Sequence, residues 1–332
     1  MYRSMHVRFR EDLVKGTVLR AATAALFAGL AWPACAATVI NEGNSARSAS
    51  AELPVAVGAE AGIFAKHGLD VRISDFQGGS KLFQAMTAGN IDIGVSAGPE
   101  MALVAKGAPV LAVCNVAPPV PFIGIAVAED SPIREVSQLK GKRIGVSSEY
   151  SLTHWLADEL ARTQGWGPDG VTSVAIGNAP EGILAAMRTH QVDAVINATV
   201  FALDLEARKQ GRLLQQVSKY EGNIAAGTIF ATRRLIDSNP DAIRQFLAAW
   251  FDTIDFMRKN KAKAVEIESK ITGYSTAVQA REYDLTFSMF SDGCTFDADS
   301  LANLKRSFLD LKILPAAPDM SKLYTDAFNP KR

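Results

Sequence analysis

The sequence predicts an α/β fold with two lobes, each built on a mixed, mostly parallel sheet that helices flank. Three observations predict it. Short apolar runs of strand length alternate with helical patterns along residues 38–210, as they do in chains that wind a parallel sheet. The alternation starts again at Asp130, which indicates a second sheet. After Thr232 the patterns are helical, and these helices need the first sheet to cover.

The first lobe opens with a strand at residues 38–40, a polar loop at 41–50 and a helix that starts near Ala51. A glycine turn leads into the second strand at 69–71. Residues 76–100 then hold a glycine turn, a short helix with Ser80 as its predicted N-cap, a buried strand and the start of another helix. Helix N-termini carry unpaired N–H groups and partial positive charge, so we expect the loops at 78–80 and 96–98 to suit an anion.

The later elements follow in the same way. Strands are predicted at 110–116, 122–128, 143–147, 171–176 and 192–196, and helices at 152–160, 180–189 and 199–210. Four helical patterns close the chain, at 240–260, 263–271, 276–290 and 297–311. We therefore expect two crossings between the lobes, near residues 123–128 and 225–230, and two crossings form a hinge that permits rigid-body closure.

Composition and charge bound the class of protein. The 332 residues are 48% hydrophobic and 21% charged, as in soluble globular proteins. Lys+Arg and Asp+Glu are equal at 35 each. No basic block interleaves with aromatic residues, which argues against a nucleic-acid partner.

The first 36 residues differ from the rest. Basic residues precede an uncharged stretch at 21–41, Pro33 interrupts the apolar run, and Ala34-Cys35-Ala36 gives a small-x-small cleavage pattern. The sequence thus predicts a signal peptide at residues 1–36 and export to the periplasm. An uncleaved membrane anchor and a lipid attached to Cys35 stay open as alternatives.

Cysteine and histidine usage says little about chemistry. Cys114 lies in an apolar run, so we expect Cys114 and Cys294 to be buried free thiols, although a disulfide between them is permitted outside the cytoplasm. The histidines after residue 36 are scattered, so no metal site is predicted. The sequence holds no nucleophile elbow and no phosphate-binding glycine loop. We expect no cofactor and favour binding over catalysis.

Several stretches together carry a family resemblance. They are residues 62–64 (GIF), 68–71 (GLDV), 85–94 (AMTAGNIDIG), 130–133 (DSPI), 139–146 (LKGKRIGV), 151–156 (SLTHWL) and 192–194 (VDA). In this order and spacing they resemble the extracytoplasmic solute-binding proteins of ABC importers, in the nitrate, sulfonate and taurine group that includes the NMT1/THI5-like proteins.

The resemblance implies a periplasmic-binding-protein type II fold, with lobe 1 at residues 37–124 and 228–332 and lobe 2 at 125–227. It implies a monomer that captures a small organic solute by hinge closure and delivers it to an ABC permease. We expect an anionic solute, a sulfonate or carboxylate, with an aromatic body as one option. Two alternatives stay open: an enzyme of the pyrimidine or thiamine-precursor or menaquinone pathway on the same fold, and a ligand-sensing domain of a membrane receptor.

The ligand site should collect hydroxyls, amides and helix N-termini from both lobes, with an aromatic wall. The predicted ligand-binding residues are Asn44, Ser45, Arg47, Gly79, Ser80, Ser96, Gly98, Phe122, Ser148, Tyr150, Ser151, Asn197 and Thr199. Arg47 is a candidate for bidentate pairing with a carboxylate or sulfonate, although a solvated loop arginine is the simpler and favoured interpretation. Tyr150 stands where the family pattern has glycine, so the resemblance implies the fold more firmly than the solute.

Overall fold

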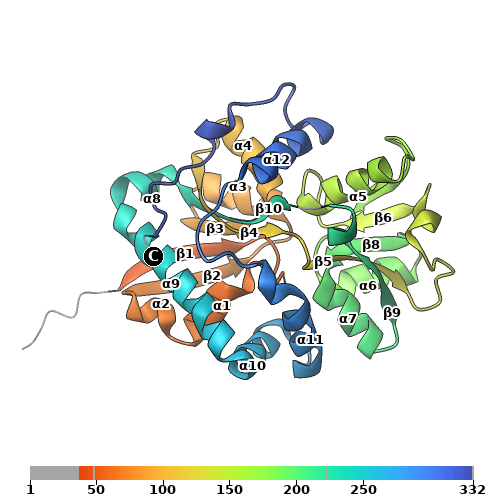
Figure 1. The fold of residues 1–332 in the computed structure, drawn as a ribbon, viewed down its shortest axis with the longest axis horizontal. Helices are drawn as coiled ribbons and strands as arrows, with labels where there is room; N and C mark the ends of the chain where they lie inside the picture. The colour runs from red at the N-terminus through yellow and green to blue at the C-terminus, as the bar shows by residue number, and fades with distance from the viewer. Residues whose placement is uncertain (1–36, 48, 222, 331–332) are drawn as a thin grey trace, which may run out of the picture. The chain divides into compact units, whose positions relative to one another are not determined.

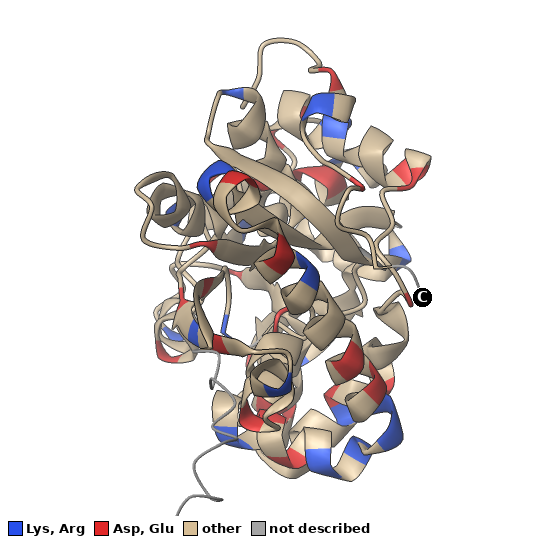
Figure 2. Ribbon diagram, turned by 90° about the vertical axis from the view of Figure 1, so that its left-hand side faces the viewer, with Lys and Arg blue, Asp and Glu red and all other residues tan. Residues whose placement is uncertain are grey.

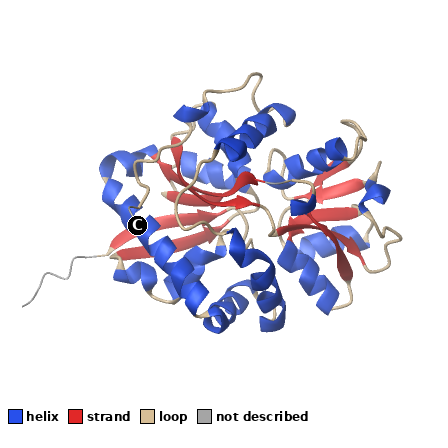
Figure 3. Ribbon diagram, viewed as in Figure 1, coloured by secondary structure: helices blue, strands red, loops and turns tan. Residues whose placement is uncertain are grey.

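The computed structural model describes residues 37–47, 49–221 and 223–330. The predicted signal peptide, residues 1–36, and Cys35 lie outside them. Two five-stranded sheets, with strand orders β2-β1-β3-β10-β4 and β7-β6-β8-β5-β9, form the framework (Figure 1). Helices lie on both faces of each sheet (Figure 3), so the predicted α/β class with two lobes is confirmed. We call the first sheet with its helices lobe 1 and the second sheet with its helices lobe 2.

The sheet of lobe 1 is mostly parallel. Its strands are β1 (Thr38–Asn44), β2 (Leu69–Asp75), β3 (Ile93–Ser96), β4 (Val110–Pro119) and β10 (Asn223–Thr232). β1 pairs in parallel with β2 and β3, whereas β10 runs antiparallel to β3 and β4. The polar loop predicted from residue 41 is wrong for its first four residues, because β1 continues through Asn44 between two partner strands.

Helices cover this sheet on its two faces. α3, α4 and α12 lie on one face, and α1, α9 and α10 on the other (Figure 1). Leu82, Phe83 and Met86 of α3 are fully buried, as the helical spacing predicts. The helices of lobe 1 are α1 (Leu53–Glu60), α2 (Ile63–Lys66), α3 (Gly79–Thr87), η1 (Gly98–Glu100), α4 (Met101–Ala105), α8 (Arg233–Ser238), α9 (Pro240–Lys259), α10 (Lys261–Thr272), α11 (Thr276–Thr286), η4 (Phe287–Met289), α12 (Ala298–Asp310) and η5 (Met320–Lys322).

Lobe 2 repeats the arrangement. Its strands are β5 (Ile123–Ala128), β6 (Arg143–Val146), β7 (Thr172–Ala175), β8 (Ala194–Ala198) and β9 (Gly211–Gln216). Its helices are η2 (Val136–Leu139), α5 (Leu152–Thr163), α6 (Pro180–Arg188) and α7 (Thr199–Ala207), and η3 (Val217–Lys219) follows β9. β6, β7 and β8 are parallel, and β5 runs antiparallel to β8 and β9.

The chain passes between the sheets twice, between Pro119 and Ile123 and between Gln216 and Asn223. The predicted lobe boundaries, at residues 124/125 and 227/228, fall inside β5 and β10 and stay a prediction. Basic and acidic residues intermix along the helices of the described chain (Figure 2). Among the described helices, none is both long enough and apolar enough to cross a membrane.

The expectation of free thiols is wrong, because Cys114 and Cys294 form a disulfide. Their Cα atoms lie 4.7 Å apart although 180 positions separate them in sequence. Tertiary packing brings the segment that holds Cys294 alongside β4, where the Ser291 amide donates to the Val116 carbonyl at 3.0 Å and the Thr295 amide donates to the Asn115 carbonyl at 2.9 Å. Nothing in the local sequence of either cysteine predicts this neighbour.

Candidate ligand site

A cavity of about 60 Å³ lies between the lobes. Its lining comes from both of them: Ser45, Ala46, Ala49, Glu52, Gly78, Gly79, Ala97, Glu100 and Ala226 in lobe 1, Phe122 and Ile123 where the chain crosses, and Ser147, Ser151, Leu152, Thr153, Asn178, Asn197 and Ala198 in lobe 2. Most of these residues lie at the carboxyl ends of β1, β2, β3, β6, β7 and β8, in the last residues of the strand or in the loop and first helical turn that follow it. The carboxyl ends of parallel strands are the usual ligand edge of an open α/β sheet.

The lobes contact each other across this cavity. The Asn178 amide donates to Gln77 Oε1 at 2.8 Å, and Asn178 Nδ2 donates to the Ser45 carbonyl at 3.3 Å. Ser80 Oγ donates to the Glu149 carbonyl at 3.2 Å. A Cβ on Gly78, whose φ is +107°, would lie 2.6 Å from Ser148 Oγ, so glycine permits this close approach. The structure therefore shows lobe 1 and lobe 2 in contact at the cavity.

The lobe 1 wall is acidic. Ser45 Oγ donates to Glu52 Oε1 at 2.6 Å, and the Ala46 amide donates to Oε2 at 2.8 Å. Glu100 is 3% exposed, and its Oε2 has no hydrogen-bond partner among the described residues. Behind them, Glu42 is fully buried, and neither of its carboxyl oxygens has a described partner.

Burial controls the titration of these carboxyl groups. It raises the pKa of Glu52 to about 8, against the opposing hydrogen bonds from Ser45 and Ala46. Burial likewise raises the pKa of Glu100 to about 8. The pKa of Glu42 lies well above its usual range because of burial first and the charge of Glu52 second. None of the described residues that line the cavity is a lysine, arginine or histidine. Glu52 and Glu100 therefore keep their protons and are uncharged at neutral pH in the absence of a ligand. The anionic solute stays a prediction.

The lobe 2 wall is a cluster of hydroxyls. Ser147 Oγ lies 2.9 Å from Thr153 Oγ1 and donates to Ser151 Oγ at 3.1 Å. Ser151 is also the N-cap of α5 and accepts the His154 amide at 3.3 Å. Capping a helix and lining a cavity are therefore compatible for this serine. Asn197, at the end of β8, extends the polar wall with its side-chain amide.

Five of the predicted residues line the cavity: Ser45, Gly79, Phe122, Ser151 and Asn197. Their contact with a ligand stays a prediction. The sequence analysis missed Glu52, Glu100 and Asn178 in the lining. Glu52 directly precedes an apolar helix, a position where a glutamate is usually solvated, so its sequence gives no sign of a cavity. Asn178 lies between β7 and α6, after Gly177 and before Pro180, and its place at the carboxyl end of a predicted strand could have identified it.

Three predicted residues in lobe 1 lie in the fold beside or behind the cavity. Asn44 Nδ2 donates to Asp75 Oδ1 at 3.5 Å. Ser96 is 1% exposed and ends β3. Gly98 opens η1, where a Cβ would lie 2.0 Å from Leu304 Cδ2, so this glycine permits close packing of α12.

Arg47 points away from the cavity. Its Nη2 donates to the Ile271 carbonyl at 2.8 Å, in the last turn of α10, and its Nε lies 3.7 Å from Asp75 Oδ2. The side chain is 64% exposed. The favourable partner for a basic group here is a helix C-terminus, so the simpler interpretation of a loop arginine describes its position.

The lobe 2 residues outside the lining have structural partners. Thr199 Oγ1 donates to the Pro121 carbonyl at 3.2 Å, which secures the chain crossing. Ser148 supplies the carbonyl that Ser151 Oγ bonds at 2.8 Å. Tyr150 is 48% exposed and adopts φ = +63°, a conformation that favours glycine. This backbone explains why the family pattern has glycine at that position.

The predicted N-cap of α3 is wrong. The helix begins at Gly79, with Gly78 as the N-cap residue, so Ser80 lies within the first turn. Its hydroxyl therefore reaches across to lobe 2 and does not bond an amide of its own helix.

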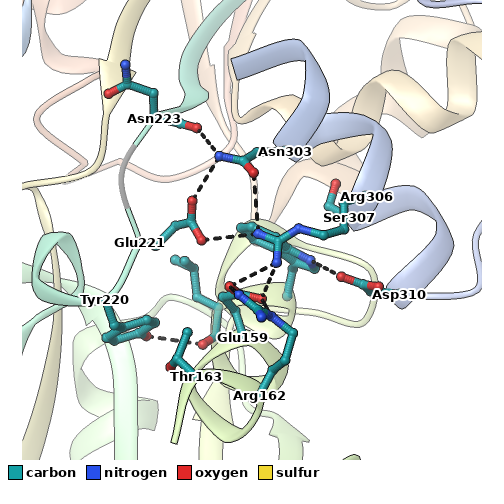
Figure 4. A network of polar contacts seen from close by, with 12 residues as sticks. Glu159, Arg162, Thr163, Tyr220, Glu221, Asn223, Asn303, Arg306, Ser307 and Asp310 are labelled. Atoms are coloured by element: carbon teal, nitrogen blue, oxygen red, sulfur yellow. Dashed lines mark hydrogen bonds and ion pairs between the residues drawn. The ribbon is translucent and has the colours of Figure 1, made fainter. Parts of the chain in front are cut away.

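A second set of contacts joins the lobes away from the cavity. Arg306 of α12 donates through Nη1 to both carboxylate oxygens of Glu159 of α5, each at 3.1 Å, and its Nη2 lies 3.4 Å from a carboxylate oxygen of Glu221 (Figure 4). Burial by itself raises the pKa of Glu159, but the hydrogen bond from Arg162 and the charge of Arg306 outweigh burial and lower it. This network holds an ionised carboxylate beside the hinge.

Helices α7 and α11 provide a third contact between the lobes. Val200 and Leu203 of α7 pack with Val278 of α11 in a small apolar cluster. Arg281 of α11 pairs with Glu206 of α7 at 2.7 Å. Within residues 37–330, apart from positions 48 and 222, no group of three or more metal-ligating side chains is placed to hold a metal ion.

The chain is similar to a known protein family and to individual members of known function. Residues 50–264 match the family model described as NMT1/THI5 like. A 4-amino-5-hydroxymethyl-2-methylpyrimidine phosphate synthase of Saccharomyces cerevisiae, THI13, is 26% identical in an alignment of 298 positions that covers 83% of each chain.

Two solved structures share the fold. The alkanesulfonate-binding protein SsuA of Xanthomonas axonopodis pv. citri, bound to MOPS, superposes with a TM-score of 0.74 at 20% identity, over 87% of this chain and 98% of that one. The periplasmic aliphatic sulphonate-binding protein SsuA of Escherichia coli gives 0.71 at 20% identity, over 86% and 92%. The expected periplasmic-binding-protein fold is confirmed.

Proposed function

The chain belongs to the NMT1/THI5-like family, and we propose that it is the solute-binding component of an ABC importer. The observation that carries this proposal is the cavity itself, whose lining comes from both lobes and whose walls are joined by hydrogen bonds across the cleft. The names of the structural relatives, an alkanesulfonate-binding and a periplasmic sulphonate-binding protein, agree with it. A small organic solute is the ligand.

The proposed mechanism is a shift of population between open and closed forms. Only the closed form brings the acidic wall of lobe 1 and the hydroxyl wall of lobe 2 to one solute, so the solute stabilises closure in proportion to its extra contacts there. The two chain crossings act as the hinge. The permease then recognises the paired lobe surfaces of the closed form.

We place the protein in the periplasm. The charge pattern of residues 1–36 is that of a signal peptide. The Cys114–Cys294 disulfide agrees with export, because disulfides persist in oxidising compartments. The proposed partners are the solute and an inner-membrane ABC permease, with one copy of this chain in each complex.

The test is a screen on the exported protein. Sulfonates, aromatic and aliphatic carboxylates, amines and pyrimidines are added singly, and a solute that binds raises the melting temperature by mass action. Small-angle X-ray scattering then compares the radius of gyration with and without that solute. Compaction on binding supports the proposal, whereas a bound solute that leaves the scattering profile unchanged contradicts hinge closure.

One observation supports an enzyme as the second candidate. The yeast relative is named as a pyrimidine phosphate synthase and matches 83% of this chain. The buried carboxyl groups of Glu52 and Glu100, with pKa values raised by burial to about 8, have the titration range of general acids or bases. Mass spectrometry of solute recovered from denatured protein separates the candidates: an unchanged solute supports transport, and a new product supports catalysis.

A further inference from the structure

The cavity between the lobes is small for an organic solute. Its volume is about 60 Å³, whereas a cavity that holds benzene measures about 150 Å³ and ligand pockets usually span about 300 to 1,000 Å³. A cavity of this size accommodates a head group of a few atoms. The rest of the solute needs further space that adjoins it.

A second cavity of about 310 Å³ supplies such a space. Glu100 lines both cavities. Gly79 and Ser151 line the inner one, and their chain neighbours Ser80 and Tyr150 line the outer one. The two cavities therefore lie side by side along the same two segments of the facing lobes.

Glu100 is the partition between them. A Cβ on Gly79 would lie 1.9 Å from Glu100 Oε1, so the carboxyl group rests directly on the first turn of α3. Its other oxygen, Oε2, is buried and has no partner among the described residues. A buried carboxyl oxygen without a partner is costly unless a ligand supplies a donor. A cationic N–H group that enters here favours the ionised carboxylate, so the carboxyl group releases its proton and Oε2 becomes the acceptor expected for that N–H group.

The two cavities differ in their ionisable side chains. The inner one has the carboxyl groups of Glu52 and Glu100, and none of its described lining residues is basic. The outer one has Lys106 and Lys312 in its lining, together with the apolar and aromatic side chains of Leu103, Ile313 and Tyr150. Tyr150 has a positive φ, which is strained for any residue except glycine. Residues with a strained backbone cluster at ligand contacts.

We infer that the two cavities form one site for a bifunctional solute, with a protonated amine or amidine between Glu52 and Glu100 and a negatively charged group at the far end beside Lys106 and Lys312. The inference rests on the proposed function and names its solute class. The body of the solute passes Glu100 and lies against Tyr150. An amidine head fits well, because its planar N–H fork pairs with carboxylates as arginine does.

Three probes of one shape test the assignment: benzamidine, benzoate and 4-amidinobenzoate. Titration calorimetry with the exported protein should rank 4-amidinobenzoate at least ten-fold tighter than benzamidine, and benzamidine tighter than benzoate. Benzoate that binds more tightly than benzamidine overturns the assignment of the inner cavity. If none of the probes binds while another solute compacts the protein, the two-part site is wrong and the proposed function stands. If no solute binds or compacts the protein, both fail.

Variants assign each end of the probe. Glu100→Gln keeps the shape of the side chain and should weaken benzamidine and 4-amidinobenzoate at least ten-fold. Gly79→Ala should also weaken both amidines at least ten-fold. Its new Cβ displaces the Glu100 carboxyl group, although Glu100 itself is unchanged. If Glu100→Gln binds both amidines as tightly as the unsubstituted protein does, the inference is wrong. Circular dichroism verifies that each variant is folded.

The lysine end has its own comparison. The double variant Lys106→Ala/Lys312→Ala should weaken 4-amidinobenzoate about ten-fold and leave benzamidine unchanged. Its matched control is Lys66→Ala/Lys140→Ala, which removes the same charge from two exposed positions elsewhere. Equal losses in both double variants would show a general field effect and overturn the outer subsite.

Discussion

Reduction of the Cys114–Cys294 disulfide should destabilise the protein strongly. The bond closes a loop of 180 positions, and the chain-entropy relation gives about 5 kcal/mol for a loop of this length, an upper value that native strain and denatured-state structure reduce toward about 2 kcal/mol. Oxidised and reduced protein have the same side chains, so no cavity term enters the comparison. Cys114 is fully buried in β4 and Cys294 is partly buried, so the protein is unfolded before reduction to make the reduction complete.

Equilibrium unfolding in urea measures the difference. One sample of the exported protein keeps its disulfide, and a second is unfolded, reduced and refolded in the presence of reductant. Circular dichroism follows the unfolding transition of each. With a slope of about 3 kcal/mol/M, a loss of 5 kcal/mol moves the midpoint by about 1.7 M. The double variant Cys114→Ala/Cys294→Ala should not respond to reductant. A change below about 1 kcal/mol at constant slope would refute the loop-closure reasoning.

Three further predictions test the charges and the hinge. Burial raises the pKa of Glu268 to about 8, and an unfolded glutamate titrates near 4.3, so the folded state retains the proton between about pH 4.5 and 8. The free energy of unfolding should therefore fall as pH rises through that window, by about 1.4 kcal/mol per pH unit for this group, and a pH series of urea titrations should show a shallower slope for Glu268→Gln. Arg306→Ala leaves the buried Glu159 with one cation fewer. It should lower the free energy of unfolding by about 1 to 3 kcal/mol, a loss that the partial exposure of Arg306 moderates. An equal melting temperature for Arg306→Ala and Arg162→Ala would contradict the bridging role of Arg306. Gln77→Ala removes the acceptor of a hydrogen bond between the lobes and should weaken any solute that closes the protein about three- to ten-fold, mainly through faster dissociation in stopped-flow measurements; an unchanged dissociation rate would count against closure.

The local elements could be predicted because each has its own periodicity. Leu82, Phe83 and Met86 give α3 its buried face within a few residues of sequence. The last four helical patterns agree with α9 to α12 to within a few residues, apart from the end of α11, which continues as η4. Where neighbours intervene, the prediction fails, as at residues 41–44, which β2 and β3 hold in strand conformation despite their polar side chains.

The sequence by itself determined the α/β class, the two sheets, the family resemblance and the strand ends that line the cavity. These depend on short-range patterns: the apolar period, the glycine turns and the helix caps. Tertiary structure alone decided which polar groups meet. Glu52 and Glu100 come from separate segments and become one acidic wall only because β1 and β3 end side by side. Cys114 finds Cys294 across 180 positions for the same reason. The ionisable groups of a binding site come from residues that are distant in the chain. Only the fold shows which of them meet, so the sequence alone could not test the expectation of an anionic solute.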